Sequence, residues 1–166
     1  MKLKFTFPVV FATIFSSSLY ATECNFTTEQ DRLIKLASSY GEPFDLKKTL
    51  PAIVVQESFV GRYVVKINPQ DGKLGSYGIT HVLLETAMWL EGEKSSWRAK
   101  DVIAERLIKD DLYALQLAVK KLQSVQKSGK SWMQVWQSYN GNNPEYAKKI
   151  RSHIRHLESC GYFNWS

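Results

Sequence analysis

Apolar residues at helical spacing constrain the fold of this chain more than any other feature of its sequence. They recur three or four residues apart in one segment after another, so that each segment can bury one face of a helix. A capping signal at Thr27–Gln30 and a helix-ending glycine at Gly41 mark the first of these segments. Helices are expected near residues 27–41, 45–61, 82–91, 98–109, 110–128, 131–139 and 144–158.

One stretch has the character of β-structure instead. Residues 63–68 are rich in β-branched side chains, Pro69–Gly72 has the composition of a turn, and residues 75–81 can return as a second strand. No repeat, low-complexity segment or linker divides the chain after residue 21. The sequence therefore predicts one mainly α domain with a small β-hairpin insertion.

The first 21 residues have the three-part layout of a secretory signal peptide. Two lysines precede the apolar run 5–15, and small residues end the segment at Ala21. The apolar run is too short to span a membrane stably, and an uncleaved N-terminal anchor is the alternative interpretation. We expect a leader at residues 1–21 and one exported domain at residues 22–166, periplasmic or secreted, with no stable membrane span after cleavage.

The two cysteines of the chain, Cys24 and Cys160, lie near the two ends of the exported part. In an oxidising compartment such a pair is expected to form a disulfide. Closing so long a loop would stabilise the fold by about 4 kcal/mol. Two free thiols are the alternative.

The charge of the chain indicates the class of its partner. The formal net charge of +6 falls to +4 without the leader, which carries two lysines and no acids. A modest basic excess suits an anionic polymer such as bacterial cell wall, whereas dispersed lysines and arginines do not favour nucleic acid. His153 and His156 stand three residues apart without a third ligand at useful spacing, so neither a metal nor another cofactor is predicted.

A carboxyl group interrupts the apolar stripe of the second predicted helix. Glu57 stands three residues after Val54 and four after Ile53, so its side chain shares their face of the helix. A carboxyl group on that face is either paired or desolvated at the wall of a cleft, and desolvation favours the protonated form that a general acid needs. Alternatively, Glu57 ends the helix and turns to solvent.

Four short sequence motifs follow one another along the chain from Glu57 onward. A helix ends in Glu57-Ser58, and the glycine-containing segment Gly75–His81 follows. Trp136–Gly141 contains Tyr-Asn before a glycine, and Tyr146–Ile150 opens a last helix. These segments resemble, in the same order, the Glu-Ser, Gly-x-x-Gly-Leu-Met-Gln, Ala-Tyr-Asn-Ala-Gly and Tyr-Val-x-x-Val segments of lytic transglycosylases, the bacterial relatives of goose-type lysozyme. The resemblance covers nearly the whole exported chain.

The resemblance implies a lysozyme-like fold whose active cleft lies beside the small β element. It implies that Glu57 is the catalytic acid and base and that Ser58 supports it by hydrogen bonding. Tyr139 would project into the cleft and orient Glu57, while Asn140 would hold the local turn and contact substrate. The other substrate-binding residues that it implies are Gly75, Ser76, Tyr77, Gly78, Ile79 and His81.

The implied activity is cleavage of the β-1,4 bond between N-acetylmuramic acid and N-acetylglucosamine in peptidoglycan glycan strands. One carboxyl group protonates the bridging oxygen and then accepts the proton of the muramoyl 6-hydroxyl, which leaves a 1,6-anhydro end. An ordinary retaining hydrolase needs a second carboxylate about 5 Å away. The small size suggests, by analogy, local wall opening for a secretion, conjugation or pilus complex.

The chain departs from the family pattern in two respects. Thr80 and His81 stand where Met and Gln are usual, and the stretch before Gly78 is longer than typical. His81 either contacts sugar or serves only as a structural residue. Asp71 offers a second carboxylate for a lysozyme-type hydrolase, although Asp71-Gly72 is more simply a turn. A non-catalytic wall-binding protein on the same fold is the remaining alternative.

Overall fold

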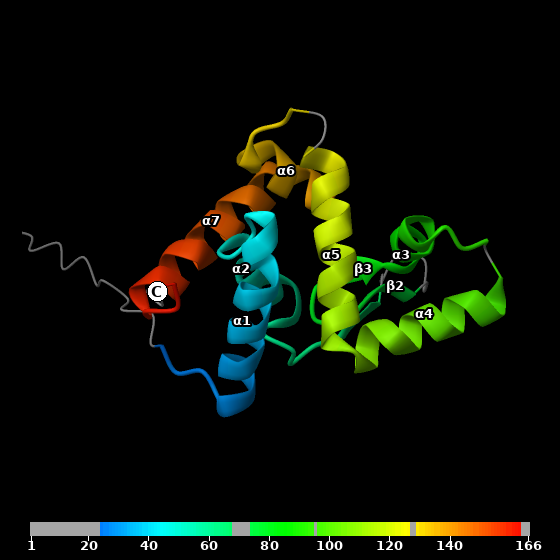
Figure 1. Cartoon of the computed structure of the whole chain (residues 1–166), viewed down its shortest axis with the longest axis horizontal. Helices are drawn as coiled ribbons and strands as arrows, with labels where there is room; N and C mark the ends of the chain where they lie inside the picture. Colours follow the sequence, from blue (N-terminus) through cyan, green and yellow to red (C-terminus); the bar gives the residue numbers. More distant parts are fainter. Residues whose placement is uncertain (1–23, 68–73, 95, 127–128, 164–166) are drawn as a thin grey trace, which may run out of the picture.

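The protein is described by a computed structural model that places residues 24–67, 74–94, 96–126 and 129–163. Within these ranges the chain forms seven α-helices, one short 3₁₀ helix and a three-stranded antiparallel sheet (Figure 1). The mainly α fold class with a small β element is therefore confirmed. The predicted leader and the predicted turn at 69–72 lie outside the described residues.

The helices agree with the predicted positions, apart from the end of α2 and the start of α3. Helix α2 ends at Ser58 instead of Gly61, because Phe59 and Val60 both adopt positive φ angles of 52° and 55°. The elements are α1 Thr28–Gly41, η1 Glu42–Phe44, α2 Thr49–Ser58, β1 Val65–Ile67, β2 Leu74–Tyr77, β3 Val82–Leu83, α3 Leu84–Glu91, α4 Trp97–Lys109, α5 Asp111–Gln126, α6 Trp132–Tyr139 and α7 Pro144–Ser159.

The β element is larger than the predicted hairpin. Strand β2 stops at Tyr77, because positive φ angles at Gly78 (76°) and His81 (45°) turn the chain back. The backbone N–H of His81 donates to the carbonyl of Gly78 at 3.1 Å and closes this turn. Residues 82–83 then pair antiparallel with β2 as a third strand, so the prediction that a helix begins at residue 82 is wrong by two residues.

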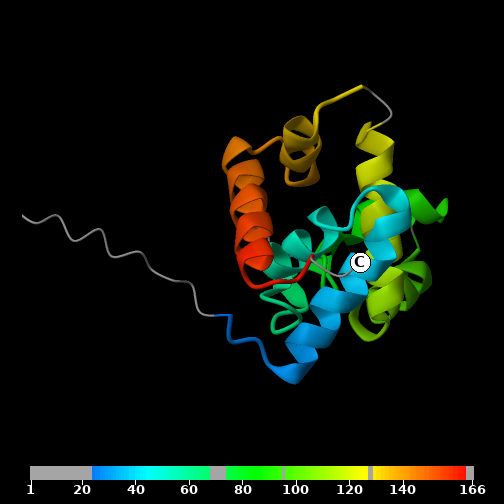
Figure 2. The ribbon, with the colours of Figure 1, turned by 60° about the vertical axis from the view of Figure 1, so that its left-hand side comes forward.

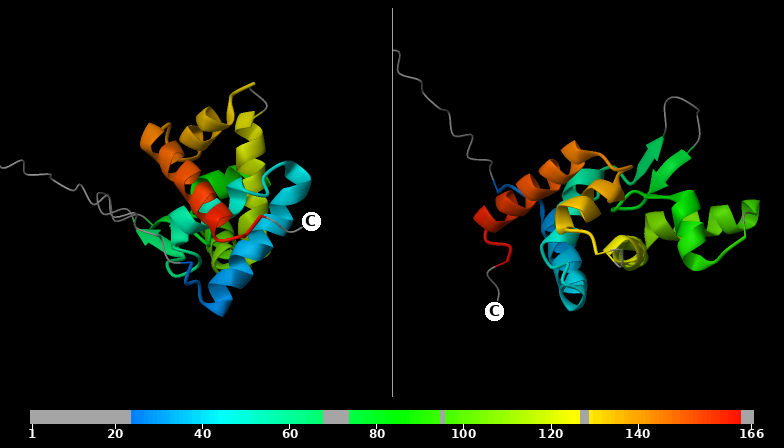
Figure 3. Two further views of the ribbon diagram at one scale, coloured as in Figure 1. Left: turned by 90° about the vertical axis from the view of Figure 1, so that its left-hand side faces the viewer. Right: turned by 90° about the horizontal axis from the view of Figure 1, so that it is seen from above.

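The core forms one continuous cluster of buried side chains around α2 and α5. Leu50 and Ile53 of α2 and Leu115 and Leu117 of α5 are fully buried. Each such side chain contributes about 1.5–3 kcal/mol relative to an exposed one. Helix α5 stands at the centre of the molecule, with α1, α2 and α7 on one side and α3 and α4 on the other (Figure 1). The sheet projects between these two groups of helices (Figure 3).

A disulfide joins Cys24 to Cys160, as the sequence predicts. It ties the segment before α1 to the end of α7, and Figure 2 shows these two parts of the chain side by side. The same end of the molecule is closed by Phe26 packing edge-on against Tyr162, whose hydroxyl donates to Asp31 at 3.0 Å. In the parts of the chain that the structure describes, no helix has the length and apolar character needed to cross a bilayer.

Gly78 lets the turn between β2 and β3 pack directly on the end of α4. A β-carbon at this position would lie 2.3 Å from the carbonyl oxygen of Leu107 and 3.1 Å from the β-carbon of Ala114. Its φ of 76° also lies in the region that favours glycine. The close approach, rather than a sugar contact, accounts for glycine at this position.

We predict that Gly78→Ala lowers the free energy of unfolding by about 3 kcal/mol or more, because backbone strain adds to a clash with backbone. Gly92→Ala is the matched control, since Gly92 has a φ of 70° and no atom within 4 Å of the added carbon. That variant should lose only about 1 kcal/mol. Urea denaturation measures both, and equal losses would show that the contact with α4 is unimportant.

Candidate active site

A cleft of about 400 Å³ lies where the sheet meets the ends of α2 and α6. It is lined by residues from six elements and two turns, and six of these residues were predicted from the sequence: Glu57, Gly75, Ser76, His81, Tyr139 and Asn140. The remaining lining residues are Lys66, Leu83, Lys121 and Gly141. Segments far apart in the sequence therefore converge on Glu57.

Glu57 occupies the last turn of α2, with its side chain only 7% exposed. The interpretation in which this residue turns to solvent is therefore wrong. Its Oε2 lies 3.4 Å from Nδ1 of His81, whose side chain is 5% exposed. The carboxyl group is held at the wall of the cleft because the rest of the same helix face, including Ile53 and Val54, is fully buried.

Two tyrosines stand beside Glu57. Tyr139 lines the cleft, but its hydroxyl donates to the carbonyl of Thr80 at 2.9 Å, so it does not orient Glu57 in the way the resemblance implies. The ring of Tyr146 stacks on that of Tyr139, with centroids 6.1 Å apart. Burial first, and then the charge of Glu57, raises the pKa of both phenols well above the ordinary value. Both hydroxyls therefore stay protonated next to the carboxyl group.

Tyr146 was not predicted as a site residue. Its hydroxyl is buried and forms no hydrogen bond of good geometry within the described residues, although it is close enough to Glu57 to be influenced by it. The sequence pattern indicates only that Tyr146 opens the last helix. Its position beside the cleft depends on how α7 packs against α2 and α6.

Lys121 is the second site residue that sequence reasoning missed. Its Nζ donates to the carbonyl of Tyr139 at 2.8 Å and lies 4.0 Å from the centre of that ring. Burial lowers the pKa of Lys121 to about 8, against a smaller opposing effect of the Glu57 charge. The sequence contains a signal for this position, because Lys121 stands four residues after Leu117 and three after Ala118. Glu57 has the same spacing to Ile53 and Val54, and this spacing places a side chain on the apolar face of its helix.

Four of the predicted substrate-binding residues do not line the cleft. The buried hydroxyl of Ser58 donates to the carbonyl of Val54 and accepts from the N–H of Gly61, so it stabilises the end of α2. Tyr77 alternates with Ser76 along β2 and lines a groove on the opposite face of the sheet. Gly78 packs on α4, and Ile79 belongs to the core.

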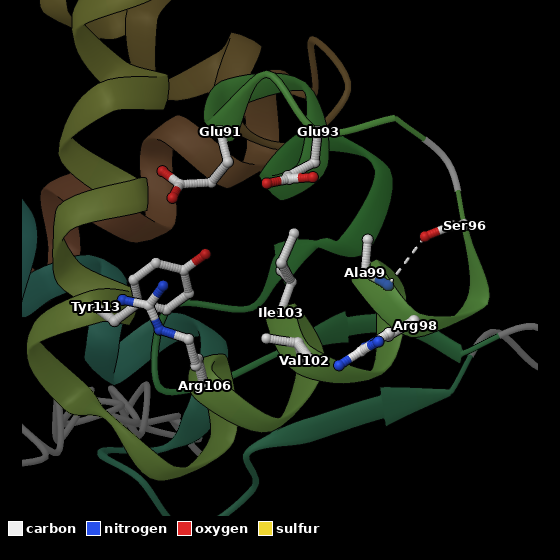
Figure 4. Close-up of a pocket in the computed structure, with 9 residues that line it drawn as sticks. All are labelled: Glu91, Glu93, Ser96, Arg98, Ala99, Val102, Ile103, Arg106 and Tyr113. Carbon is white, nitrogen blue, oxygen red and sulfur yellow. Dashed lines mark hydrogen bonds between the residues drawn. The ribbon is translucent and has the colours of Figure 1, made fainter.

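A second hollow, of about 330 Å³, lies between the end of α3, α4 and the start of α5 (Figure 4). Glu91 and Glu93 face it from one side and Val102 and Ile103 from the other, while Arg106 covers the ring of Tyr113 at 3.8 Å. No residue predicted as a site residue lines it. The cleft at Glu57 is the candidate active site, because six of the predicted site residues line it, whereas Tyr77 is the one such residue in the groove on the opposite face of the sheet.

Metal-binding side chains do not gather in the described residues. No group of three histidine, cysteine, aspartate or glutamate side chains there could hold a metal ion. His153 contacts the side-chain oxygen of Gln56 through Nε2 at 3.0 Å. Asp71, the alternative second carboxylate, lies outside the described residues.

Comparisons of the chain with protein-family models, with curated protein sequences and with solved structures gave no match.

We predict that Lys121→Met raises the free energy of unfolding at pH 7 by about 1–2 kcal/mol, because the buried charge is removed. Between pH 8 and the ordinary lysine pKa of 10.5, the unfolded wild-type chain binds more protons than the folded one. Wild-type stability therefore rises with pH in this window, and the advantage of the variant should shrink there.

The matched control is Lys120→Met, because Lys120, the residue before Lys121 on α5, is 40% exposed and pairs with Glu91 at the end of α3. Its effect should stay within about 0.5 kcal/mol. Denaturant titrations at pH 7 and pH 10.5 measure both variants. A Lys121→Met protein that is less stable than wild type at pH 7 would contradict this account of the buried lysine.

Proposed function

We propose that the protein is a peptidoglycan lytic transglycosylase, an exported enzyme that cleaves the bond between N-acetylmuramic acid and N-acetylglucosamine and leaves 1,6-anhydro ends. The observation that carries the proposal is the placement of Glu57, nearly excluded from water, at the wall of a cleft. The resemblance of Glu57-Ser58 and the later segments to that family supports the same reaction. The lysozyme-like fold is part of this proposal.

The charges of the cleft support a mechanism with one carboxyl group. Glu57 is the single acidic residue among the described residues that line it. A retaining hydrolase needs a second carboxylate about 5 Å away as nucleophile, and the described lining residues do not supply one. Lys66 and Lys121 are the lysines among these described lining residues and would attract the carboxylates of an anionic wall polymer.

In the proposed reaction, Glu57 donates a proton to the bridging oxygen as the glycosidic bond breaks. The resulting carboxylate then takes the proton of the muramoyl 6-hydroxyl. The oxygen of this hydroxyl attacks C1 of the same N-acetylmuramic acid, where the glycosidic bond has broken, and closes the 1,6-anhydro ring. No water is consumed. The backbone at Gly75 and Ser76 borders the path of the glycan, and the missing side chain at Gly75 allows a sugar ring to approach closely.

Two alternatives remain beside this proposal. A lysozyme-type hydrolase would use the same Glu57 with a water molecule and a second carboxylate, for which Asp71 is the candidate. A wall-binding protein would use the cleft without cleaving the glycan. A role in local wall opening for a secretion, conjugation or pilus complex would follow from the transglycosylase proposal, by analogy alone.

The test is digestion of purified peptidoglycan, with the released fragments analysed by mass spectrometry. The exported protein should release fragments about 18 Da lighter than hydrolysed ones, because no water is added. Glu57→Gln should lower the cleavage rate by a factor of about 10²–10⁴, since it keeps the shape and removes the acid.

The matched control for Glu57→Gln is Glu85→Gln, an exposed glutamate that lies outside the cleft and should retain wild-type activity. Hydrolysed ends would favour the lysozyme-type alternative. Wall binding without cleavage by the wild-type protein would favour the binding protein. Equal cleavage by wild type and Glu57→Gln would eliminate Glu57 as the acid.

A further inference from the structure

The side chain of His81 is fixed between two partners. Its Nε2 lies 2.6 Å from the carbonyl oxygen of Tyr63, and its Nδ1 lies 3.4 Å from Oε2 of Glu57. A carbonyl oxygen only accepts hydrogen bonds, so Nε2 must carry a hydrogen. In the neutral ring the lone pair of Nδ1 therefore faces the carboxyl group of Glu57.

Among the described residues, Glu57 is the one neighbour that Nδ1 of His81 could pair with. Nδ1 is buried and forms no hydrogen bond with any residue that the structure describes, apart from its contact with Glu57. The other titratable groups around the pair are Tyr139, Tyr146 and Lys121, and the pKa shifts of all three include a contribution from the Glu57 charge. A buried ring nitrogen without a partner is costly, so a proton between Nδ1 and Oε2 would satisfy both groups.

The backbone at His81 is also unusual. Its φ of 45° lies in the left-handed region, which non-glycine residues adopt uncommonly. The turn that imposes this angle directs the imidazole toward Glu57. Strand β3 begins at the next residue. Backbone in such a conformation persists where surrounding contacts hold it, and here the Tyr63 carbonyl holds the ring.

We propose that His81 is a positioning residue for Glu57, which holds Oε2 through Nδ1 so that the proton to be transferred is carried on Oε1. In the acid form the pair then carries two protons: Nδ1–H donates to Oε2, and Oε1–H is the proton that passes to the bridging oxygen. After the transfer the same Nδ1–H donates to the carboxylate, whose Oε1 takes the proton of the 6-hydroxyl. A pair without a proton between Nδ1 and Oε2 would set two acceptors against each other.

This inference rests on the proposed function and gives His81 a different role from the sugar contact that the resemblance implies. Glutamine, the residue usual at this position in the family, carries both a donor and an acceptor. It could therefore hold a carboxyl group in a similar way. The substitution of His for Gln would then preserve the restraint on Glu57 while changing the group that makes it.

Kinetics separates positioning from sugar binding. His81→Ala should lower kcat by about 10- to 100-fold with KM changed less than about twofold, because the acid is misplaced and the sugar contacts remain. His81→Gln should recover most of that loss. Circular dichroism and thermal melting show whether each variant is folded. If folded His81→Ala keeps wild-type kcat, or if only KM rises, the proposal is overturned.

A nitrogen NMR experiment tests the pairing without any catalysis. In the wild-type protein labelled with ¹⁵N-histidine, Nε2 of His81 should carry a hydrogen, and Glu57→Ala should shift its Nδ1 resonance. His156, which lies near Cys160 at the other end of α7, serves as the internal control and should not change. A His81 ring without a hydrogen on Nε2, or an unchanged Nδ1 resonance in Glu57→Ala, overturns the proposal.

The two experiments distinguish the possible failures. If the wild-type protein does not cleave peptidoglycan, the proposed function fails, while the NMR result still decides whether His81 and Glu57 share a proton. If the wild-type protein is active and folded His81→Ala is equally active, the proposed function stands and the positioning role fails.

Discussion

The candidate site depends on one constraint: the carboxyl group of Glu57 is kept from water at the end of a helix that is packed into the core. Leu50, Ile53 and Val54 anchor α2 in the core, so the last turn of this helix has little freedom. Phe59 and Val60 then turn the chain sharply away, which leaves the carboxyl group at the wall of the cleft. The packing of α2 in the core therefore also determines the position of the candidate acid.

Several groups in and beside the cleft are held in positions that reduce stability locally. Lys121 is largely buried with its charge, and the pKa of its amine is lowered to about 8 as a result. His81 adopts a positive φ, and the hydroxyl of Tyr146 is buried without a hydrogen bond of good geometry in the described residues. Polar groups held at such cost tend to gather at functional sites, where selection for stability is balanced by selection for activity.

The sequence predicted what depends on local periodicity and missed what depends on packing. Long amphipathic helices were found because each buries its own apolar stripe, and Glu57 was found on such a stripe. The early end of α2 was missed, since positive φ at Phe59 and Val60 leaves no mark in composition. Strand β3 is two residues long and too short for a pattern. Tyr146 reaches the site only because α7 packs beside α2, which periodicity does not reveal.

The most direct measurement is a crystal structure of the Glu57→Gln protein with a tetrasaccharide of alternating N-acetylglucosamine and N-acetylmuramic acid. The account predicts a glycan along Gly75 and Ser76, with one bridging oxygen within about 3 Å of the side chain at position 57. His81 should contact that side chain rather than the sugar. A glycan bound elsewhere on the molecule, or one whose bridging oxygens all lie far from position 57, would contradict the account.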